Sequence, residues 1–400
     1  MSENVDTICV QGGYQPGNGE SRTPPIIQAT TFKYKSSEQM SRLFDLSESG
    51  YFYTRLQNPT NDTIAAKICE MEGGAAAMLT SSGQAANFFA LFNICNNGDH
   101  IVASSAIYGG TFNLINVTMR KIGHRMHVRK PGLHRRRARS GIPAEHQGGL
   151  RRIHLQPGAH RAGLRQVRER GASSRRAADR RQYVPDAVNC RPFQYGVDIV
   201  THATTKYMDG HGSCVGGAIV DSGNFDWMAH AEKFPGTHHA GRLLPWRDLC
   251  QGLRQGRLHH QGLPHSSCAI SAPRRRRSTR GLWACIWSRW ACVWSAICAN
   301  ALKVAQWLSA DPRISWVSFP GLEEDKYHAL AEKYMPNGTC GVISFGVPGG
   351  REKGVRVPRP PEDGVHRHTC GRRAQLHPIP GRHHAPSAHR GAARRSRRWH

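Results

Sequence analysis

The chain has 400 residues, a formal net charge of +27 and 12 cysteines. This length suits two or three domains with a sizeable core. The charge is typical of nucleic-acid-binding proteins, and the absence of C-x-x-C pairs argues against a zinc site or a disulfide framework. The N-terminal sequence does not resemble a secretion signal, and no apolar run reaches the roughly 20 residues of a membrane helix. The sequence therefore predicts a cytoplasmic protein without membrane or metal.

The positive charge is unevenly distributed along the chain. Residues 1–127 carry nine Lys and Arg against ten Asp and Glu, whereas residues 128–185 carry 16 against three. A segment of ordinary composition is thus followed by one in which almost every charged residue is arginine.

The first 127 residues show the alternation of an α/β protein. Residues 61–72 have apolar side chains at helical spacing, with Thr60 or Asn61 as the expected helix cap. Residues 75–95 and 99–115 each read as a strand, a turn and a helix. This pattern predicts a mostly parallel sheet with functional sites at the carboxyl ends of its strands.

Three later segments lack any such periodicity: residues 128–185, 237–297 and 351–400, all rich in Arg, His, Gly and Pro. Disordered basic linkers are one interpretation. The other is that the coding DNA is read out of frame there. Back-translating each segment with chosen codons and moving the frame forward by one nucleotide gives protein-like sequence; "RQYVPDA", for example, becomes DNTFPT. We favour this second interpretation, in which the three segments are translation artefacts.

Five in-frame motifs occur in order: "QGGYQPGNGESRTPPIIQATTFKYKSSEQM", "YFYTRLQNPTNDTIAAKICEMEGG", "SSGQAAN", "SSAIYGGTFNLI" and "VTHATTKYMDGHG". Together they resemble the pyridoxal-phosphate (PLP) enzymes of cysteine and methionine metabolism, and among these the O-acetylhomoserine sulfhydrylases. The resemblance implies the type I fold of PLP-dependent transferases, disrupted in the three segments. It divides the chain into an N-terminal arm (1–60), a PLP-binding large domain (61–250) and a smaller C-terminal α/β domain (251–400).

Lys206 follows the strand-like sequence "DIVTH". A lysine that forms a Schiff base must stand at such a strand end, partly shielded from water. A lone lysine is usually an exposed loop residue, but the flanking "TTK" and "DGHG" favour the functional interpretation. The resemblance implies that Lys206 holds PLP and moves protons, and that Tyr108 stacks on the ring and assists the leaving group. A half-buried structural tyrosine is the alternative for Tyr108.

The cofactor's phosphate needs aligned N–H donors, which a Ser-Gly turn that opens a helix supplies. The resemblance assigns this role to the amides of Gly83 and Gln84 and to the hydroxyl of Thr205. Ala203 stands where the family usually has a serine, so one hydrogen bond to the phosphate is lost.

Tyr53 and Arg55 resemble the pair that grips the phosphate of the neighbouring subunit, for which an arginine fork is well suited. The alternative is an ordinary loop with a surface arginine. The resemblance therefore implies a homo-oligomer, a dimer of dimers, with active sites shared between subunits.

Two residues of the family pattern are missing from the chain as written. The aspartate that pairs with the pyridine nitrogen is read as "RQYV", and the arginine that binds the substrate carboxylate falls in "CGRRAQ". No residue here takes over either role. A ring without its aspartate is a poorer electron acceptor.

The resemblance implies that O-acetylhomoserine and sulfide, or a small thiol, give homocysteine and acetate. Cystathionine γ-synthase, cystathionine γ-lyase and methionine γ-lyase are alternatives within the family. A basic nucleic-acid-binding protein is an alternative of another class, although the arginine segments lack interleaved aromatic residues. As written, we expect the chain to fold poorly and to turn over little substrate.

Overall fold

The computed structural model describes residues 4–45, 47–104, 107–129, 152–155, 178–182, 187–210, 214–226 and 290–348. The expected domain boundary at residue 250, the segment 351–400 and most of segments 128–185 and 237–297 lie outside these residues. No helix in the described part of the chain is both long and apolar enough to cross a bilayer.

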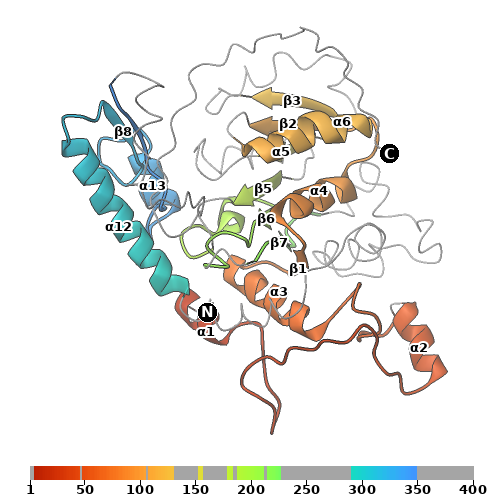
Figure 1. Cartoon of the computed structure of the whole chain (residues 1–400). Helices are drawn as coiled ribbons and strands as arrows, with labels where there is room; N and C mark the ends of the chain where they lie inside the picture. The colour runs from red at the N-terminus through yellow and green to blue at the C-terminus, as the bar shows by residue number, and fades with distance from the viewer. Residues whose placement is uncertain are drawn as a thin grey trace, which may run out of the picture.

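Seven strands form one sheet in the order β1-β7-β6-β5-β4-β2-β3 (Figure 1). The strands are β1 (Ala76–Thr80), β2 (His100–Ser104), β3 (Arg125–Arg129), β4 (Arg152–Leu155), β5 (Ala178–Gln182), β6 (Ile199–His202) and β7 (Gly217–Asp221). Strand β7 is antiparallel to β1 and β6, and the other neighbouring pairs are parallel. The prediction of a mostly parallel sheet is confirmed.

Helices cover both faces of this sheet. The helices are α1 (Val5–Gln11), α2 (Ser37–Phe44), α3 (Pro59–Glu72), α4 (Gly83–Ile94), α5 (Gly109–Asn113), α6 (Met119–Lys121), α12 (Trp290–Ala310) and α13 (His328–Tyr334). A π-helical segment, η1 (Leu114–Thr118), joins α5 to α6, and a 3-10 turn, η3 (Pro192–Tyr195), precedes β6.

Two hydrophobic cores lie on opposite faces of the sheet because successive strand residues point to opposite sides. Leu79 and Val200 belong to the first core with residues of α1, α3 and α12, whereas Met78 and Ile199 belong to the second with residues of α4 and η1. Every residue of β1, β2, β6 and β7 is buried, as in a sheet covered on both faces.

Helix α3 begins at Pro59 with Asn58 as its cap, so the prediction that Thr60 or Asn61 caps it is wrong. The Asn58 side chain accepts the N–H of Thr60 at 3.1 Å, and proline at the first helical position needs no acceptor for an N–H. Thr60 instead donates its hydroxyl to the Pro25 carbonyl at 2.8 Å and accepts the N–H of Ile27 at the same distance. The N-terminal arm is thereby fastened to the start of α3.

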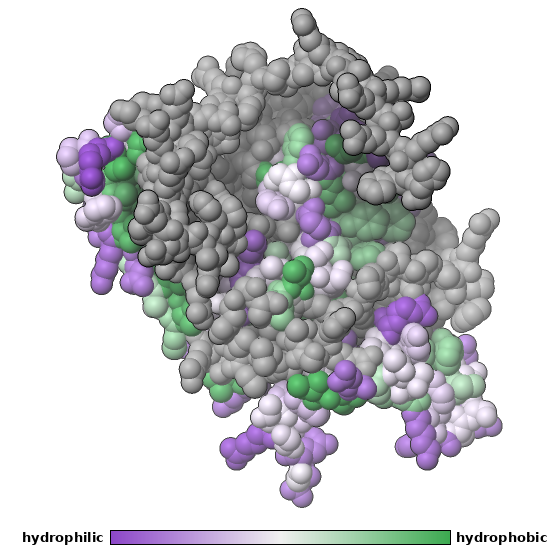
Figure 2. Space-filling view, in the orientation of Figure 1, coloured by the Kyte–Doolittle hydropathy of each residue, from purple (hydrophilic) through white to green (hydrophobic). Residues whose placement is uncertain are grey.

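The arm itself extends away from the sheet and carries α2 at its far end (Figure 1). Hydrophilic and hydrophobic groups lie side by side on it in the space-filling view (Figure 2). Its exposed large apolar side chains are Ile26, Met40, Phe44, Tyr51 and Tyr53.

Residues 290–348 form α12, α13 and a two-stranded antiparallel sheet of β8 (Trp316–Ser318) and β9 (Ser344–Gly346). Trp290 and Trp294 of α12 are buried in the first core. The helix therefore begins inside the segment that we expect to be out of frame, ahead of the expected boundary at residue 298.

Candidate active site

The carboxyl ends of β1 and β6 lie at the same edge of the sheet, on either side of the amino end of β7. Thr80 pairs with Gly217, and His202 pairs with Ala218. The turn that contains Ser82 follows β1, and the turn that contains Lys206 follows β6. The sheet thus brings together two motifs that are more than a hundred residues apart.

Ser82 forms the cap of α4. Its hydroxyl accepts the N–H of Ala85 at 3.0 Å, and its carbonyl accepts the N–H of Ala86 at 2.9 Å. The amides of Gly83 and Gln84 precede these and have no acceptor within the helix itself. They lie at the positive end of the helix dipole, which suits an anion.

Lys206 lies in the turn after β6 and is half-buried. Its N–H donates to the Ala203 carbonyl at 3.2 Å, and its own carbonyl accepts the N–H of Gly210 at 3.1 Å. The next residue, Tyr207, places its ring 4.3 Å from that of Trp294. These contacts hold the backbone on both sides of the lysine.

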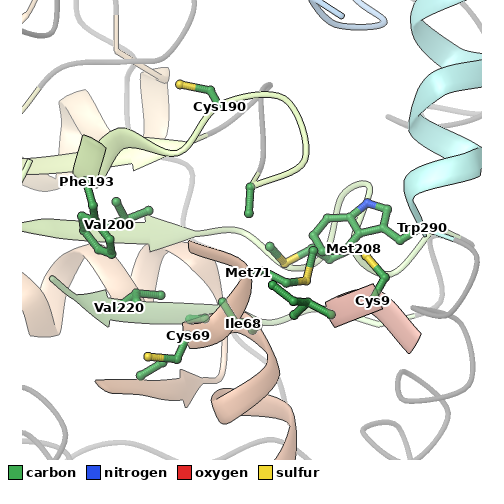
Figure 3. Packing of buried hydrophobic residues seen from close by; sticks show 14 of the residues in the cluster. Cys9, Ile68, Cys69, Met71, Cys190, Phe193, Val200, Met208, Val220 and Trp290 are labelled. Atoms are coloured by element: carbon green, nitrogen blue, oxygen red, sulfur yellow. The ribbon is translucent and has the colours of Figure 1, made fainter. Parts of the chain in front are cut away.

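Met208 anchors the same turn in the first hydrophobic core. It lies beside Met71, Cys9 and Trp290 in the close-up view (Figure 3). The lysine turn therefore rests on helices of one face of the sheet.

Two glycines at the start of β7 bring the lysine turn against the Ser82 turn. The Thr205 hydroxyl accepts the N–H of Gly216 at 3.0 Å and donates to its carbonyl at 3.3 Å. A β-carbon on Gly217 would collide with the Ser82 carbonyl, so only glycine permits this approach. In this arrangement the hydroxyl hydrogen of Thr205 points at the Gly216 carbonyl.

A buried hydrogen-bond network joins β6, α4 and α5. Thr201 donates to Asn87 Oδ1 at 2.7 Å, and Asn87 Nδ2 donates to Thr111 Oγ1 at 3.1 Å and to Gln84 Oε1 at 3.3 Å. Thr111 also donates to Gln84 Oε1 at 3.0 Å. Tyr108 is the N-cap of α5, and its half-exposed ring lies beside Gly110, as does the Gln84 amide. The network thus connects the elements that carry Lys206, Gln84 and Tyr108.

Tyr53 and Arg55 occupy the extended arm and are not members of this network. Tyr53 pairs with Thr31 of the same arm, and the Arg55 guanidinium lies 5.3 Å from the centre of the Tyr53 ring. Both side chains are exposed. Within one subunit they form a pair of their own.

The other face of β6 carries a buried pair of polar side chains. His202 Nε2 lies 2.7 Å from Oε1 of Glu72, the last residue of α3. The Glu72 side chain is fully buried and that of His202 is 4% exposed. The last two residues of β6 are therefore held from opposite sides, Thr201 by α4 and His202 by α3.

A family model described as "Cys/Met metabolism PLP-dependent enzyme" matches residues 6–137 and 182–358. The chain belongs to this family. Its membership establishes PLP as the cofactor and favours the enzyme over the nucleic-acid-binding protein. Apart from residues 1–5, the residues that the family model leaves unmatched are 138–181 and 359–400, which fall within two of the three segments that we expect to be out of frame.

Individual relatives agree with this assignment. The chain is 34% identical to an O-acetyl-L-homoserine sulfhydrylase of Leptospira meyeri over 365 residues, which cover 87% of this chain and 80% of the relative. It is 32% identical to the homocysteine/cysteine synthase of Saccharomyces cerevisiae over 374 residues, or 87% and 79% of the two chains.

The fold is similar to that of a putative O-acetylhomoserine (thiol)-lyase from Campylobacter jejuni, solved with N'-pyridoxyl-lysine-5'-monophosphate. The TM-score is 0.82, with 24% identity over 89% of this chain and 86% of the other. This similarity confirms the type I fold.

The described residues fit two groups of a PLP molecule, its phosphate and its aldehyde. The amino end of α4 offers backbone donors for the phosphate, and the half-buried Lys206 offers an amine for the aldehyde. Thr204 adds a buried hydroxyl that has no partner among the described residues. The chemistry of this donor set matches a phosphorylated aldehyde.

The pyridine nitrogen of PLP would need a carboxylate partner, and the sequence at the end of β5 does not supply one. This strand ends with Arg180, Arg181 and Gln182, and Gln182 pairs with His202. Asp179 comes earlier and pairs with Ile199. The sequence of β5 thus agrees with the expectation that the family aspartate is absent.

Sequence reasoning did not identify Asn87, Thr111, Thr201 or the Glu72–His202 pair. Each of these residues looks like an ordinary helix or strand residue in the sequence. The sequence of β6, with apolar Ile199 and Val200 followed by polar Thr201 and His202, carried no sign of which helices these residues meet. Only the arrangement of helices on the two faces of the sheet supplies that information.

Proposed function

We propose that this chain catalyses the PLP-dependent sulfhydrylation of O-acetyl-L-homoserine. Sulfide or a small thiol replaces acetate on Cγ: the Cγ–O bond breaks as acetate leaves, a Cγ–S bond then forms, and sulfide gives homocysteine. The identity to relatives named for this reaction over most of both chains is the observation that carries the proposal.

In this proposal, each functional residue has a separate task. The amides of Gly83 and Gln84, with the Thr205 hydroxyl, bind the phosphate. The amine of Lys206 would hold the aldehyde carbon until the amine of the substrate displaces it, and the freed lysine amine would then take the proton from Cα of the substrate. When bound, PLP supplies an acceptor for the electron pair that this proton leaves behind.

Tyr108 packs on the flat ring of the cofactor and places its hydroxyl on the side of the departing acetate. Its position as the N-cap of α5, half-exposed beside the Gln84 amide, supports this role.

We further propose that a second copy of this chain completes the site. The paired side chains of Tyr53 and Arg55 lie exposed on the arm, where they can reach a neighbouring subunit. The exposed apolar side chains of the same arm support a protein interface there. An arginine from the partner would add a bidentate donor for the phosphate.

The reaction in this form depends on an acid at the pyridine nitrogen, which the end of β5 lacks in the chain as written. We therefore assign the full activity to the frame-corrected protein. A low turnover by the written chain follows from the same proposal.

The test is borohydride reduction of the purified chain after incubation with PLP, followed by peptide mass spectrometry. We expect the pyridoxyl label on Lys206 and not on the exposed lysine Lys303 of α12. Lys206→Ala should abolish the visible absorbance of the bound aldehyde and lower activity by at least about 10³-fold, while Lys303→Ala should change neither. A label on another lysine would contradict the assignment.

A further inference from the structure

The strand that leads into Lys206 is tied by side chains to the helix that opens with Gly83 and to the helix that Tyr108 caps. Asn87 stands at the centre of this connection, on α4, and is fully buried. Its partners come from β6 (Thr201), α5 (Thr111) and the first turn of α4 (Gln84).

The polarity of these hydrogen bonds is fixed by chemistry. Thr201 and Asn87 are fully buried, and a buried polar atom without a partner is costly. Asn87 Oδ1 can only accept, and it accepts the Thr201 hydroxyl; Asn87 Nδ2 can only donate, and its two hydrogens go to Thr111 and Gln84. Turning the amide over would place Asn87 Oδ1 against Gln84 Oε1, two acceptors, so with Gln84 placed in this way the Asn87 amide has one favourable orientation.

Gln84 transmits this orientation to the site. Its Oε1 accepts from both Asn87 and Thr111, which turns its Nε2 toward Gly110 and the Tyr108 ring. The Tyr108 ring and the Gln84 amide both come close to the position that a β-carbon on Gly110 would occupy. The network thus fixes how the Tyr108 ring and the Gln84 amide lie relative to the start of α4.

We propose that Asn87 is a positioning residue for the cofactor. Through Thr201 it sets the strand that leads into the Lys206 turn, and through Gln84 and Thr111 it sets the phosphate-binding turn and Tyr108. We assign Asn87 and Thr201, which are both fully buried, no direct contact with the cofactor. This inference rests on the proposed function, because it presumes that PLP spans Lys206 and the amino end of α4.

The test compares two isosteric threonine substitutions in the purified full-length chain. Thr201→Val removes the donor to Asn87 and leaves a buried acceptor without a partner. Thr63→Val, the matched control, removes a hydroxyl that bonds to the Pro59 carbonyl on the opposite face of the sheet. We expect Thr201→Val to raise the dissociation constant of PLP about tenfold, and Thr63→Val to change it by less than about twofold.

A second measurement separates positioning from general loosening of the fold. The visible circular dichroism of bound PLP reports the placement of the ring in its site. We expect Thr201→Val to change this signal and to lower kcat more than it raises KM, and Thr201→Ser, which keeps the hydroxyl, to restore both. Thr63→Val should leave the signal unchanged.

The outcomes are distinct. If the unsubstituted chain binds no PLP, the proposed function fails and this inference fails with it. If it binds PLP but Thr201→Val matches Thr63→Val in affinity and circular dichroism, the network is only structural and this inference alone is overturned. Should Thr201→Val not fold, Thr111→Val removes the second donor to Gln84 and must show the same change.

Discussion

The strands of the sheet are of two kinds. Strands β1, β6 and β7 are buried and mostly apolar, and β1 pairs with β7 along its whole length. Strands β4 and β5 read "RIHL" and "ADRRQ", and the residues paired between them are His154 with Ala178 and Leu155 with Asp179. A strand in the middle of a parallel sheet is usually almost continuously apolar. The sheet thus runs through β4 and β5 although their local sequence does not support central strands.

The largest effect on stability should come from giving β4 and β5 an apolar sequence like that of β1, β6 and β7. Restoring the frame over residues 128–185 replaces the arginines of β5 with the sequence around DNTFPT and returns the carboxylate for the pyridine nitrogen. Strands in the middle of a parallel sheet are usually almost continuously apolar, so we expect a large rise in soluble yield and in the unfolding temperature. Calorimetry and the PLP content of the purified protein measure this.

The same prediction has a simple check in the DNA. Sequencing around codons 128, 186, 237, 298 and 351 should find a one-nucleotide displacement at the edges of the three segments. An uninterrupted frame with the same arginine codons would show that β4 and β5 are native strands. Their difference from β1, β6 and β7 would then have another cause.

Among single substitutions near β1, β6 and β7, Glu72→Ala should lower the free energy of unfolding the most. It leaves His202, at the end of β6, buried without its carboxylate partner. Breaking a buried pair in this way costs about 3–5 kcal/mol. The free energy of unfolding in urea measures the loss.

Two variants of α3 serve as controls for this prediction. Glu72→Gln keeps an acceptor for His202 and should cost less. Glu70→Ala removes an exposed carboxylate that accepts the N–H of Gly13 at 3.1 Å, and should change stability by less than about 1 kcal/mol. If Glu72→Ala is no worse than Glu70→Ala, the buried pair does not hold β6.

The sequence predicted the parts of the site that depend on local pattern. The turn at Ser82 and the turn at Lys206 each follow an apolar strand, and parallel strands bring such turns to one edge. The sequence did not predict the bonds from Thr201 to Asn87 and from His202 to Glu72, because these partners are 114 and 130 residues apart. Which helix covers which face decides such bonds, and residue spacing does not encode it.

The start of α12 was also missed, for a related reason. Trp290 and Trp294 fall in a segment of irregular composition, yet their spacing of four places both on one helical face against the first core. Large aromatic side chains bury well whatever frame encodes them. A segment that is read out of frame can therefore still contribute side chains to the core, although it lacks the residues typical of the family at those positions.

Trp294→Ala tests how much this segment of irregular composition contributes to the stability of the fold. Trp294 is 1% exposed and packs on Tyr207, next to Lys206. Removing it should cost about 3 kcal/mol through the cavity that it leaves. Trp307→Ala on the same helix, where the ring is 62% exposed, should cost less than about 0.5 kcal/mol. Equal losses in urea unfolding would mean that α12 does not pack on the lysine turn.

The smallest effect concerns the edge of the sheet beyond β4, where His124 precedes β3. Burial lowers the pKa of its imidazole, against a weaker opposing effect of a hydrogen bond from the imidazole to the backbone of Asn96. The unfolded chain, with an ordinary pKa near 6.5, then binds the proton more readily than the folded chain. Stability should therefore fall slightly as the pH drops below about 6.5 and level off below the lowered folded-state pKa. His124→Gln should flatten that part of the stability–pH curve, whereas His328→Gln on α13 should leave it in place; an unchanged curve for His124→Gln would show that this edge does not contribute to the pH response.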